Sequence, residues 1–420
     1  MLKLCSNGGY HMGLIKDSKY IKDLSTYFMY MIFSNLRFTR PIFLIFILDK
    51  GISLFEFSIL QIIYFSSRIL SNVPSGILAD LLRKRNVISM GLLMSSCSFL
   101  LLFISTYLDM SNYFYFFIIA FILDGIGSAF CSGADQAMVY EHLKEKGVEK
   151  HYVKIFGIKE ALVATALGLS AFIGGFAAAS YLSLPFLMQS IAGIVATLAV
   201  LRFKESVQEV KVTKNPSMIN KLQSGYRVVK KLPYIQFLIL FMAIISSSTN
   251  SVIMFTQSRF AELELSNSTI GTIYLGSTII SVIISLNVNL VMKFKLNTIA
   301  TLVMGIFFVG GIFIISSNII LAIIGYYLIY VTIDILEPPL FFTINELVQE
   351  NVRATVLSFF STVLSIISLI MFLIYGLTGD IGGYENLIIL MLVIHIPLFA
   401  FVFYYYKKEL LTTNKVDKYI

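Results

Sequence analysis

The stretch GILADLLRKRN, residues 76–86, lies between two long apolar runs and combines one acid with a block of three cations. The chain around it has 420 residues, of which 57% are hydrophobic and 13% are charged. Because a soluble domain carries about 25% charged residues, this composition excludes an ordinary soluble protein and predicts an integral membrane protein with several spans. The net charge of +8 does not indicate nucleic-acid binding, since the cations gather in short loops between apolar runs.

The apolar runs predict twelve transmembrane helices, because a membrane-spanning helix needs about 20 predominantly apolar residues. They fall into two sets of six, separated by one long polar linker at 204–232. The predicted spans are 24–48, 54–79, 87–108, 112–138, 154–180, 182–202, 233–259, 268–292, 296–317, 318–347, 354–377 and 385–406. We therefore expect an all-α integral membrane protein of two six-helix bundles, at 24–203 and 233–406.

The loops between the spans predict the orientation. Most Lys and Arg residues fall in the N-terminal tail at 1–23, in alternate loops, in the linker and in the C-terminal tail at 407–420. By the positive-inside rule these segments, and so both termini, are cytoplasmic. We expect a multi-pass protein of the plasma membrane, and the sequence leaves open whether Met1 or Met12 starts the chain.

Polar residues inside the spans are concentrated in the first helix of each group of three. They are Arg37 and Arg40 in the first span, Asp124 in the fourth, Asn250 and Gln257 in the seventh, and Asp334 and Glu337 in the tenth. A charge at membrane depth costs several kcal/mol and normally faces a protein interior or a water-filled cavity. Four three-helix units with one polar helix each predict a central cavity lined by helices 1, 4, 7 and 10, which is an architecture of secondary transporters.

The spacing of these charges gives more detailed expectations. Residues three apart share a helix face, so Arg37 should lie beside Arg40, and Asp334 beside Glu337. Asp124 is a candidate substrate or proton-coupling carboxylate, because a site of low dielectric favours the protonated form of an acid. It is equally a candidate structural partner for the arginines, which in turn either hold an anionic group or neutralise the acids. Asp334 and Glu337 share this ambiguity.

The remaining polar residues carry weaker predictions. Arg68, in the second span, is expected to form a structural ion pair with a helix of the other bundle. Asn250 and Gln257 are expected to bond a neighbouring helix, with contact to the substrate as the alternative. The four histidines and three cysteines are dispersed, so the sequence predicts no metal site, no cofactor and no enzyme. It contains no G-x-x-x-x-G-K-[ST] sequence, so ATP is not expected to drive the protein directly.

With these features the chain resembles the major facilitator superfamily over its whole length. The loop pattern of that family is approximately G-x-x-x-D-[RK]-x-G-[RK]-[RK]. The residues of the opening stretch that match it are Gly76, Asp80, Lys84 and Arg85, whereas Leu81 and Arg83 depart from it. The resemblance implies that this loop, Arg83 included, is a conformational latch, whose Asp closes against the start of helix 11 in the outward-facing state. The alternative is that the charged loop only anchors the topology.

Further fragments are similar to other sequences of the family, some of them from bacterial efflux-type members. DGIGSAF, at 124–130, resembles a glycine-rich pattern of the fourth helix, although Asp124 replaces its glutamine. The stretches at 36–53 and 132–147 are also similar to those of efflux-type members.

The resemblance implies a secondary transporter that works by alternating access, and we expect proton-coupled export of a small amphipathic compound, either a drug or a metabolite. The alternatives are uptake or exchange of a small metabolite, and a non-transporting receptor or scaffold of the same fold. The expected partners are the substrate, protons and the lipid bilayer, with no nucleic acid, and the expected state is a monomer. The identity of the substrate, the coupling ion and the direction of transport stay open.

Overall fold

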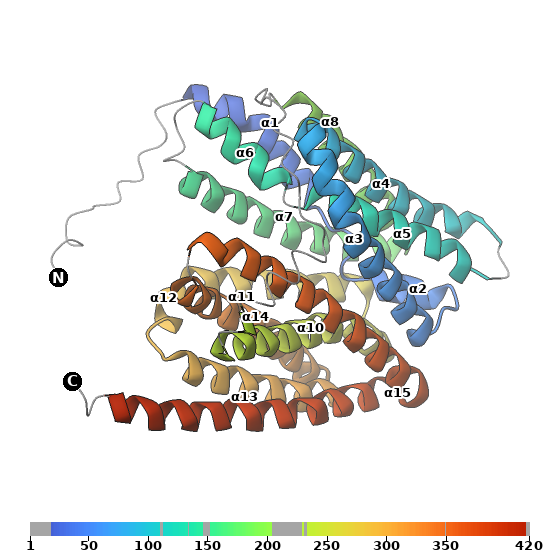
Figure 1. Ribbon diagram of the computed structural model, residues 1–420. Helices are drawn as coiled ribbons and strands as arrows, with labels where there is room; N and C mark the ends of the chain where they lie inside the picture. The colour runs from blue at the N-terminus through green and yellow to red at the C-terminus, as the bar shows by residue number, and fades with distance from the viewer. Residues whose placement is uncertain are drawn as a thin grey trace.

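Figure 1 shows a computed structural model of the chain, which describes residues 18–109, 112–132, 134–145, 152–203, 229–230, 233–348 and 350–416. Within these ranges the regular elements are helices, and no strand occurs. The first bundle contains α1 (Ser18–Ser34), α2 (Phe43–Asp49), α3 (Leu54–Leu81), α4 (Lys84–Ile104), η1 (Ser105–Tyr107), α5 (Phe114–Cys131), α6 (Ala134–Glu145), α7 (Tyr152–Ser180) and α8 (Leu184–Arg202). The second contains α10 (Pro233–Glu262), α11 (Asn267–Leu286), α12 (Val288–Val291), α13 (Leu296–Ile315), α14 (Ile319–Leu347) and α15 (Glu350–Val416).

The helices account for all twelve predicted spans, although only ten segments of the described ranges are long and apolar enough to cross a membrane by themselves. The first predicted span is divided into α1, of 17 residues, and α2, of 7, so neither part qualifies. The eleventh and twelfth spans count as one because α15 contains two helices joined at Gly383, where φ is 73°. The prediction of an all-helical membrane protein is confirmed.

Several predicted boundaries differ from the structure. Helix α1 begins at Ser18, inside the predicted tail at 1–23, and α15 continues to Val416, inside the predicted tail at 407–420. Both extensions continue the helix beyond its apolar run, which is all that the hydropathy criterion detects. The fourth predicted span, 112–138, ends at Cys131, and its polar end belongs to the separate helix α6. Most of the predicted linker at 204–232 lies outside the described residues.

The two bundles pack together at one face of the molecule and separate at the other (Figure 1). We call the face that carries the start of α1 and the connection between α3 and α4 the terminal face. Near the opposite face a single apolar core joins both bundles, with Phe46 and Phe57 from the first and Phe255 and Tyr384 from the second. Phe57 meets Phe255 edge to face, with ring centroids 6.0 Å apart. Near the terminal face, each bundle has an apolar core of its own.

The helix pairs that join the bundles are α7 with α11, α3 with α15, and α2 with α10. Glycine is required where α7 crosses α11, because a Cβ atom on Gly175 would lie 2.6 Å from the carbonyl oxygen of Asn267 and 2.6 Å from the Cα of Gly271. Backbone atoms cannot move aside as the end of a side chain can. Small residues therefore set the close approach of the two bundles at the closed face.

Candidate functional site

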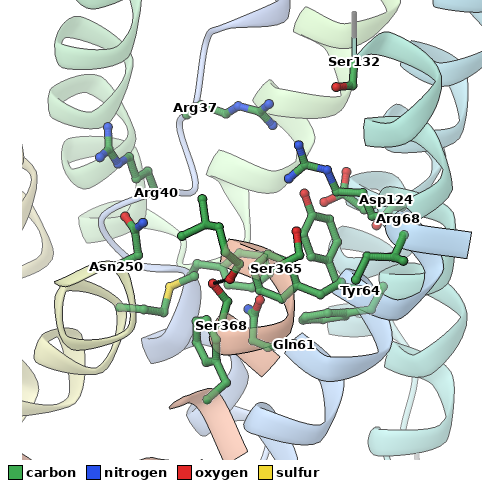
Figure 2. Close-up of a pocket in the computed structure, with 18 of the residues that line it drawn as sticks. Arg37, Arg40, Gln61, Tyr64, Arg68, Asp124, Ser132, Asn250, Ser365 and Ser368 are labelled. Carbon is green, nitrogen blue, oxygen red and sulfur yellow. Dashed lines mark hydrogen bonds between the residues drawn. The ribbon is translucent and has the colours of Figure 1, made fainter. Parts of the chain in front are cut away.

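A cavity of about 1050 Å³ lies between the bundles. Its walls come from the segment between α1 and α2 and from helices α2, α3, α4, α5, α7, α8, α10, α11 and α15. Figure 2 shows part of this lining. It extends to Gly76 near the end of α3, to Ser132 after α5 and to Phe359 near the start of α15, all toward the terminal face. At its other end lies the apolar core that joins the bundles. The cavity is thus accessible from the terminal face and closed at the opposite one.

The prediction that helices 1, 4, 7 and 10 line this cavity is wrong for the tenth. Helix α14 contributes no described lining residue, whereas α3 and α15 contribute several. Asp334 and Glu337 lie instead on the face of α14 that also carries Tyr330, and both are half-buried. Asp334 lies beside Ser281 of α11. The prolines at 338 and 339 do not interrupt this helix, which is continuous to Leu347.

The two arginines of the first span do not share a helix face as predicted, because residues 35–42 are not helical. Irregular backbone at membrane depth is tolerated only where its polar groups find partners in the protein or in water. Side chains of three other helices supply them here. The Arg37 N–H donates to Ser170 Oγ of α7 at 2.8 Å, and the Thr39 N–H donates to Gln189 Oε1 of α8 at 3.2 Å.

Gln257 of α10 supplies the third set of partners, and it does so from the other bundle. Its Oε1 accepts from the Leu44 N–H at 2.8 Å, and its Nε2 donates to the Arg40 carbonyl at 2.9 Å. Nε2 also donates to the Tyr274 hydroxyl at 3.1 Å. One buried amide therefore pairs the backbone on both sides of Pro41 and ties the first span to the second bundle.

Arg40 interacts with aromatic residues of the second bundle. Its Nη2 donates to the hydroxyl of Tyr330 at 3.1 Å, and its guanidinium carbon lies 5.8 Å from the centroid of the Tyr330 ring and 5.9 Å from that of Tyr274. A guanidinium within about 6 Å of an aromatic face is attracted by the ring quadrupole. Asn250 is exposed to the cavity on the same side (Figure 2).

Asp124 lies on the opposite wall with Arg37 and Arg68. It accepts a hydrogen bond from Ser95 Oγ at 2.7 Å and interacts electrostatically with both arginines. In Figure 2, Arg37 and Arg68 extend toward one another, and Asp124 lies beside Arg68. The prediction that Arg68 pairs with the other bundle is wrong for the described residues, because the acid with which it interacts is Asp124 of its own bundle and it forms no ion pair with a described residue of the second bundle. Sequence reasoning placed Arg68 in a structural ion pair and so outside the site.

The charged loop of the opening stretch connects α3 to α4. Arg83 is exposed, and Arg85 Nη1 donates to the carbonyls of Leu201 at 3.4 Å and Phe203 at 3.1 Å, at the end of α8. A cation at a helix C-terminus is favoured by the helix dipole, so Arg85 fixes the start of α4 to α8. The side chain of Asp80 lies outside the described residues, and its role as a latch, together with Gly76 and Lys84, stays a prediction.

Sequence reasoning did not select three other residues of the site. Gln189 accepts a hydrogen bond from the backbone of the broken first span, and Gln61 lines the cavity. Tyr64 donates to Ser128 at 3.2 Å, beside Asp124. The available signal was a polar side chain in an apolar span, which by itself does not distinguish the cavity from a contact between helices.

Comparison with known proteins identifies the fold. The sequence profile of the Major Facilitator Superfamily matches residues 24–372. The structure is similar to that of a mutant of the nucleoside transporter NupG, with a TM-score of 0.74 and 10% identity over 92% of this chain and 98% of that one.

It is also similar to a D-xylose-proton symporter, with a TM-score of 0.69 and 11% identity over 91% of this chain and 97% of that one. A bacterial homolog of the human lysosomal transporter Spinster, inward-facing and unoccupied, gives a TM-score of 0.69 and 13% identity over 91% and 96% of the two chains. At these identities the likeness shows the fold. No curated protein matches the chain in sequence.

Proposed function

Because the chain belongs to the major facilitator superfamily, we propose that it is a secondary active transporter that moves a small amphipathic compound by alternating access. The observation that carries this proposal is a polar cavity between the bundles that is accessible from the terminal face and closed at the other by a shared apolar core. Such transporters hold the substrate at a site between two bundles, and the bundles open this site to one side of the membrane and then to the other.

The contacts at the closed face indicate what must change when that face opens. Gln257 bonds the broken first span, Arg40 bonds Tyr330, and Gly175 packs on Gly271. Each of these contacts joins one bundle to the other. When the closed face opens, these contacts have to break or rearrange. At the same time residues 76–86 and the start of α15 approach each other at the terminal face.

Proton coupling through Asp124 is the second part of the proposal. Asp124 is the one acid among the described residues that line the cavity, and it lies near two arginines. Loading a proton on it would remove the negative charge that offsets those arginines, and releasing the proton would restore it. A deep acid whose charge depends on the state of the cavity is suited to couple proton movement to substrate binding. Asp334 and Glu337, on the neighbouring face of α14, are the second candidates.

The direction we propose is export, with protons entering, on the resemblance of residues 36–53 and 132–147 to efflux-type proteins. Uptake or exchange of a metabolite is the alternative. From the charges of the loops we propose that both termini are cytoplasmic. A monomer in the plasma membrane stays a prediction.

The test is transport in proteoliposomes with an imposed pH gradient and a panel of amphipathic compounds. Asp124→Asn should abolish gradient-driven accumulation and spare counterflow of the same compound, and Asp334→Asn and Glu337→Gln are measured in parallel. Asp109→Asn, which removes an exposed acid outside the cavity, is the matched control. Full gradient-driven transport in all three variants would reject proton coupling through these groups. Absence of both fluxes for every compound would favour a receptor or scaffold.

A further inference from the structure

The cavity has an excess of positive charge. The ionisable residues among its described lining are Arg37, Arg40, Arg68 and Asp124, which is three cations against one anion. Among the described residues, no carboxylate oxygen lies within 4.0 Å of any of the three guanidinium groups. Cations at membrane depth are normally paired with acids or with backbone carbonyls, because an uncompensated charge there is costly. The charge of this site is therefore incompletely balanced by the protein.

The three arginines differ in what occupies their donors. Arg40 is engaged by the hydroxyl of Tyr330 and by two aromatic faces, so it has a structural role at the closed face. The guanidinium groups of Arg37 and Arg68 form no hydrogen bond to a described residue, and Arg37 is exposed to the cavity. They extend toward one another from the broken first span and from α3 (Figure 2). The two guanidinium groups that face one another present fixed, forked donors of the kind that suits a carboxylate or a phosphate group.

Space and further polar side chains adjoin this pair. A side pocket of about 370 Å³ inside the first bundle is lined by Arg37, Arg68 and Asp124, and by the hydroxyl groups of Tyr64 and Ser128. Lys159 also lines it but pairs with its neighbour Glu160 at 3.5 Å, so these two add no net charge. The pocket and the main cavity share the two arginines. A small anionic group can therefore sit beside the arginines without filling the main cavity.

The main cavity offers an apolar surface to the rest of a ligand. Phe65, Phe99, Phe121, Met254 and Phe372 line it, and they come from both bundles. A ligand that contacts these residues must present an apolar body, whereas one that contacts the arginines must present an acceptor group of negative charge. Together the two surfaces define an amphipathic anion.

We infer that the transported compound carries an anionic group, a carboxylate or a phosphate, which is held between Arg37 and Arg68 beside Asp124. This rests on the proposed transport function and adds the class of substrate to it. Asp124 lies near the two arginines and so competes with the ligand for them while it is ionised. Binding of the anion and loading of a proton on Asp124 thus favour each other, so for an anionic substrate this coupling supports the alternative of uptake together with protons over export. Arg68, which sequence reasoning placed in a structural ion pair, becomes a residue of the binding site.

The experiment reads the charge of the cavity and its occupancy without any transport. Ser365 lines the cavity from α15, and Ser365→Cys is introduced into the full chain with Cys5, Cys97 and Cys131 replaced by serine. In detergent, its rates of modification by anionic sulfonatoethyl and cationic trimethylammonioethyl methanethiosulfonate are compared. The ratio is normalised to Ser317→Cys, an exposed position between α13 and α14.

We expect the anionic reagent to be favoured at Ser365→Cys, and Arg37→Gln and Arg68→Gln each to lower the ratio. For charges about 10 Å apart in water, loss of one unit of charge changes the ratio about fourfold, and more where water is sparse. Arg37→Lys and Arg68→Lys should keep the ratio, which separates loss of charge from misfolding. Lys293→Gln, which removes an exposed cation outside the cavity, should leave it unchanged.

Occupancy is measured by protection of Ser365→Cys from the neutral hydroxyethyl reagent. The probes are N-benzoylglycine and phenyl phosphate, which distinguish the two anionic groups, and N-benzoylglycinamide, the neutral counterpart of the first. We expect the acids to slow modification more than the amide, and to lose this advantage in Arg37→Gln and Arg68→Gln. Either a normalised ratio that does not favour the anionic reagent, or equal modification with the acids and the amide, would overturn the inference. Neither result bears on whether the protein transports a neutral compound.

Discussion

Replacing Gln257 by leucine tests whether the broken first span depends on one amide of the other bundle. The side chain is 1% exposed and pairs two backbone groups, the Leu44 N–H and the Arg40 carbonyl. Leucine has a similar volume and no polar atom, so the packing of α10 is retained while both backbone hydrogen bonds and the one to the Tyr274 hydroxyl are lost. The Tyr274 hydroxyl still donates to the Ile253 carbonyl, so the main loss falls on the two backbone groups.

The size of the effect follows from the burial of these groups. A buried backbone group that loses its partner costs about 1–3 kcal/mol. Leu44 is fully buried, so its N–H has no access to water, whereas the Arg40 carbonyl belongs to a residue that lines the cavity. We expect a loss of about 2–4 kcal/mol in the free energy of unfolding, with water replacing part of the second hydrogen bond.

The same hydrogen bonds join the two bundles, so they stabilise only the state in which this face is closed. Loss of about 2 kcal/mol from that state alone would shift its equilibrium with the opposite state about 30-fold. Modification of Ser365→Cys from the face opposite the termini should therefore become faster in Gln257→Leu.

The assay is unfolding in mixed micelles with increasing sodium dodecyl sulfate, followed by circular dichroism. Gln189→Leu should lower the free energy of unfolding by a comparable amount, because the N–H and the hydroxyl of the buried Thr39 lose their acceptor. Gln61→Leu is the control, since Gln61 is buried at the cavity wall and its side chain forms no hydrogen bond to a described residue. We expect it to change the free energy of unfolding by less than about 1 kcal/mol. Equal free energies of unfolding for the Gln257 and Gln61 variants would refute the idea that the Gln257 amide stabilises the non-helical segment of the first span.

Three further predictions concern the latch, the orientation and the closed face. Asp80→Asn should insert normally but transport poorly; normal flux at equal expression would reduce Asp80 to a loop residue. An impermeant thiol reagent outside intact cells should modify Ser53→Cys but not Ser217→Cys, and the reverse pattern would overturn the predicted orientation. Gly175→Ala should cost about 1–3 kcal/mol of unfolding free energy by overpacking α7 on α11. Gly305→Ala, where the added Cβ meets nothing within 4 Å, should be neutral or stabilising, and equal losses in both would contradict the glycine contact.

Much of the candidate site could be selected from the sequence because a charge in an apolar span is conspicuous. Arg37, Arg40, Asp124 and Asn250 were chosen on that basis, and all four line the cavity. The same criterion selected Asp334, which does not line it, because the criterion reports the depth of a residue and says nothing of the direction in which its helix face points.

The sequence alone determined the membrane class, the number of spans and the division into two sets of six. These depend on the length of each apolar run, which is a local property of the chain. Only the tertiary structure decided where the first span breaks, because a helix can open at membrane depth only if its backbone finds new partners. Those partners are Ser170, Gln189 and Gln257, which lie 133, 150 and 213 residues along the chain from the groups they pair. No local pattern indicates such a distant pairing, and it is this pairing that directs Arg37 toward Arg68 and Arg40 toward the second bundle.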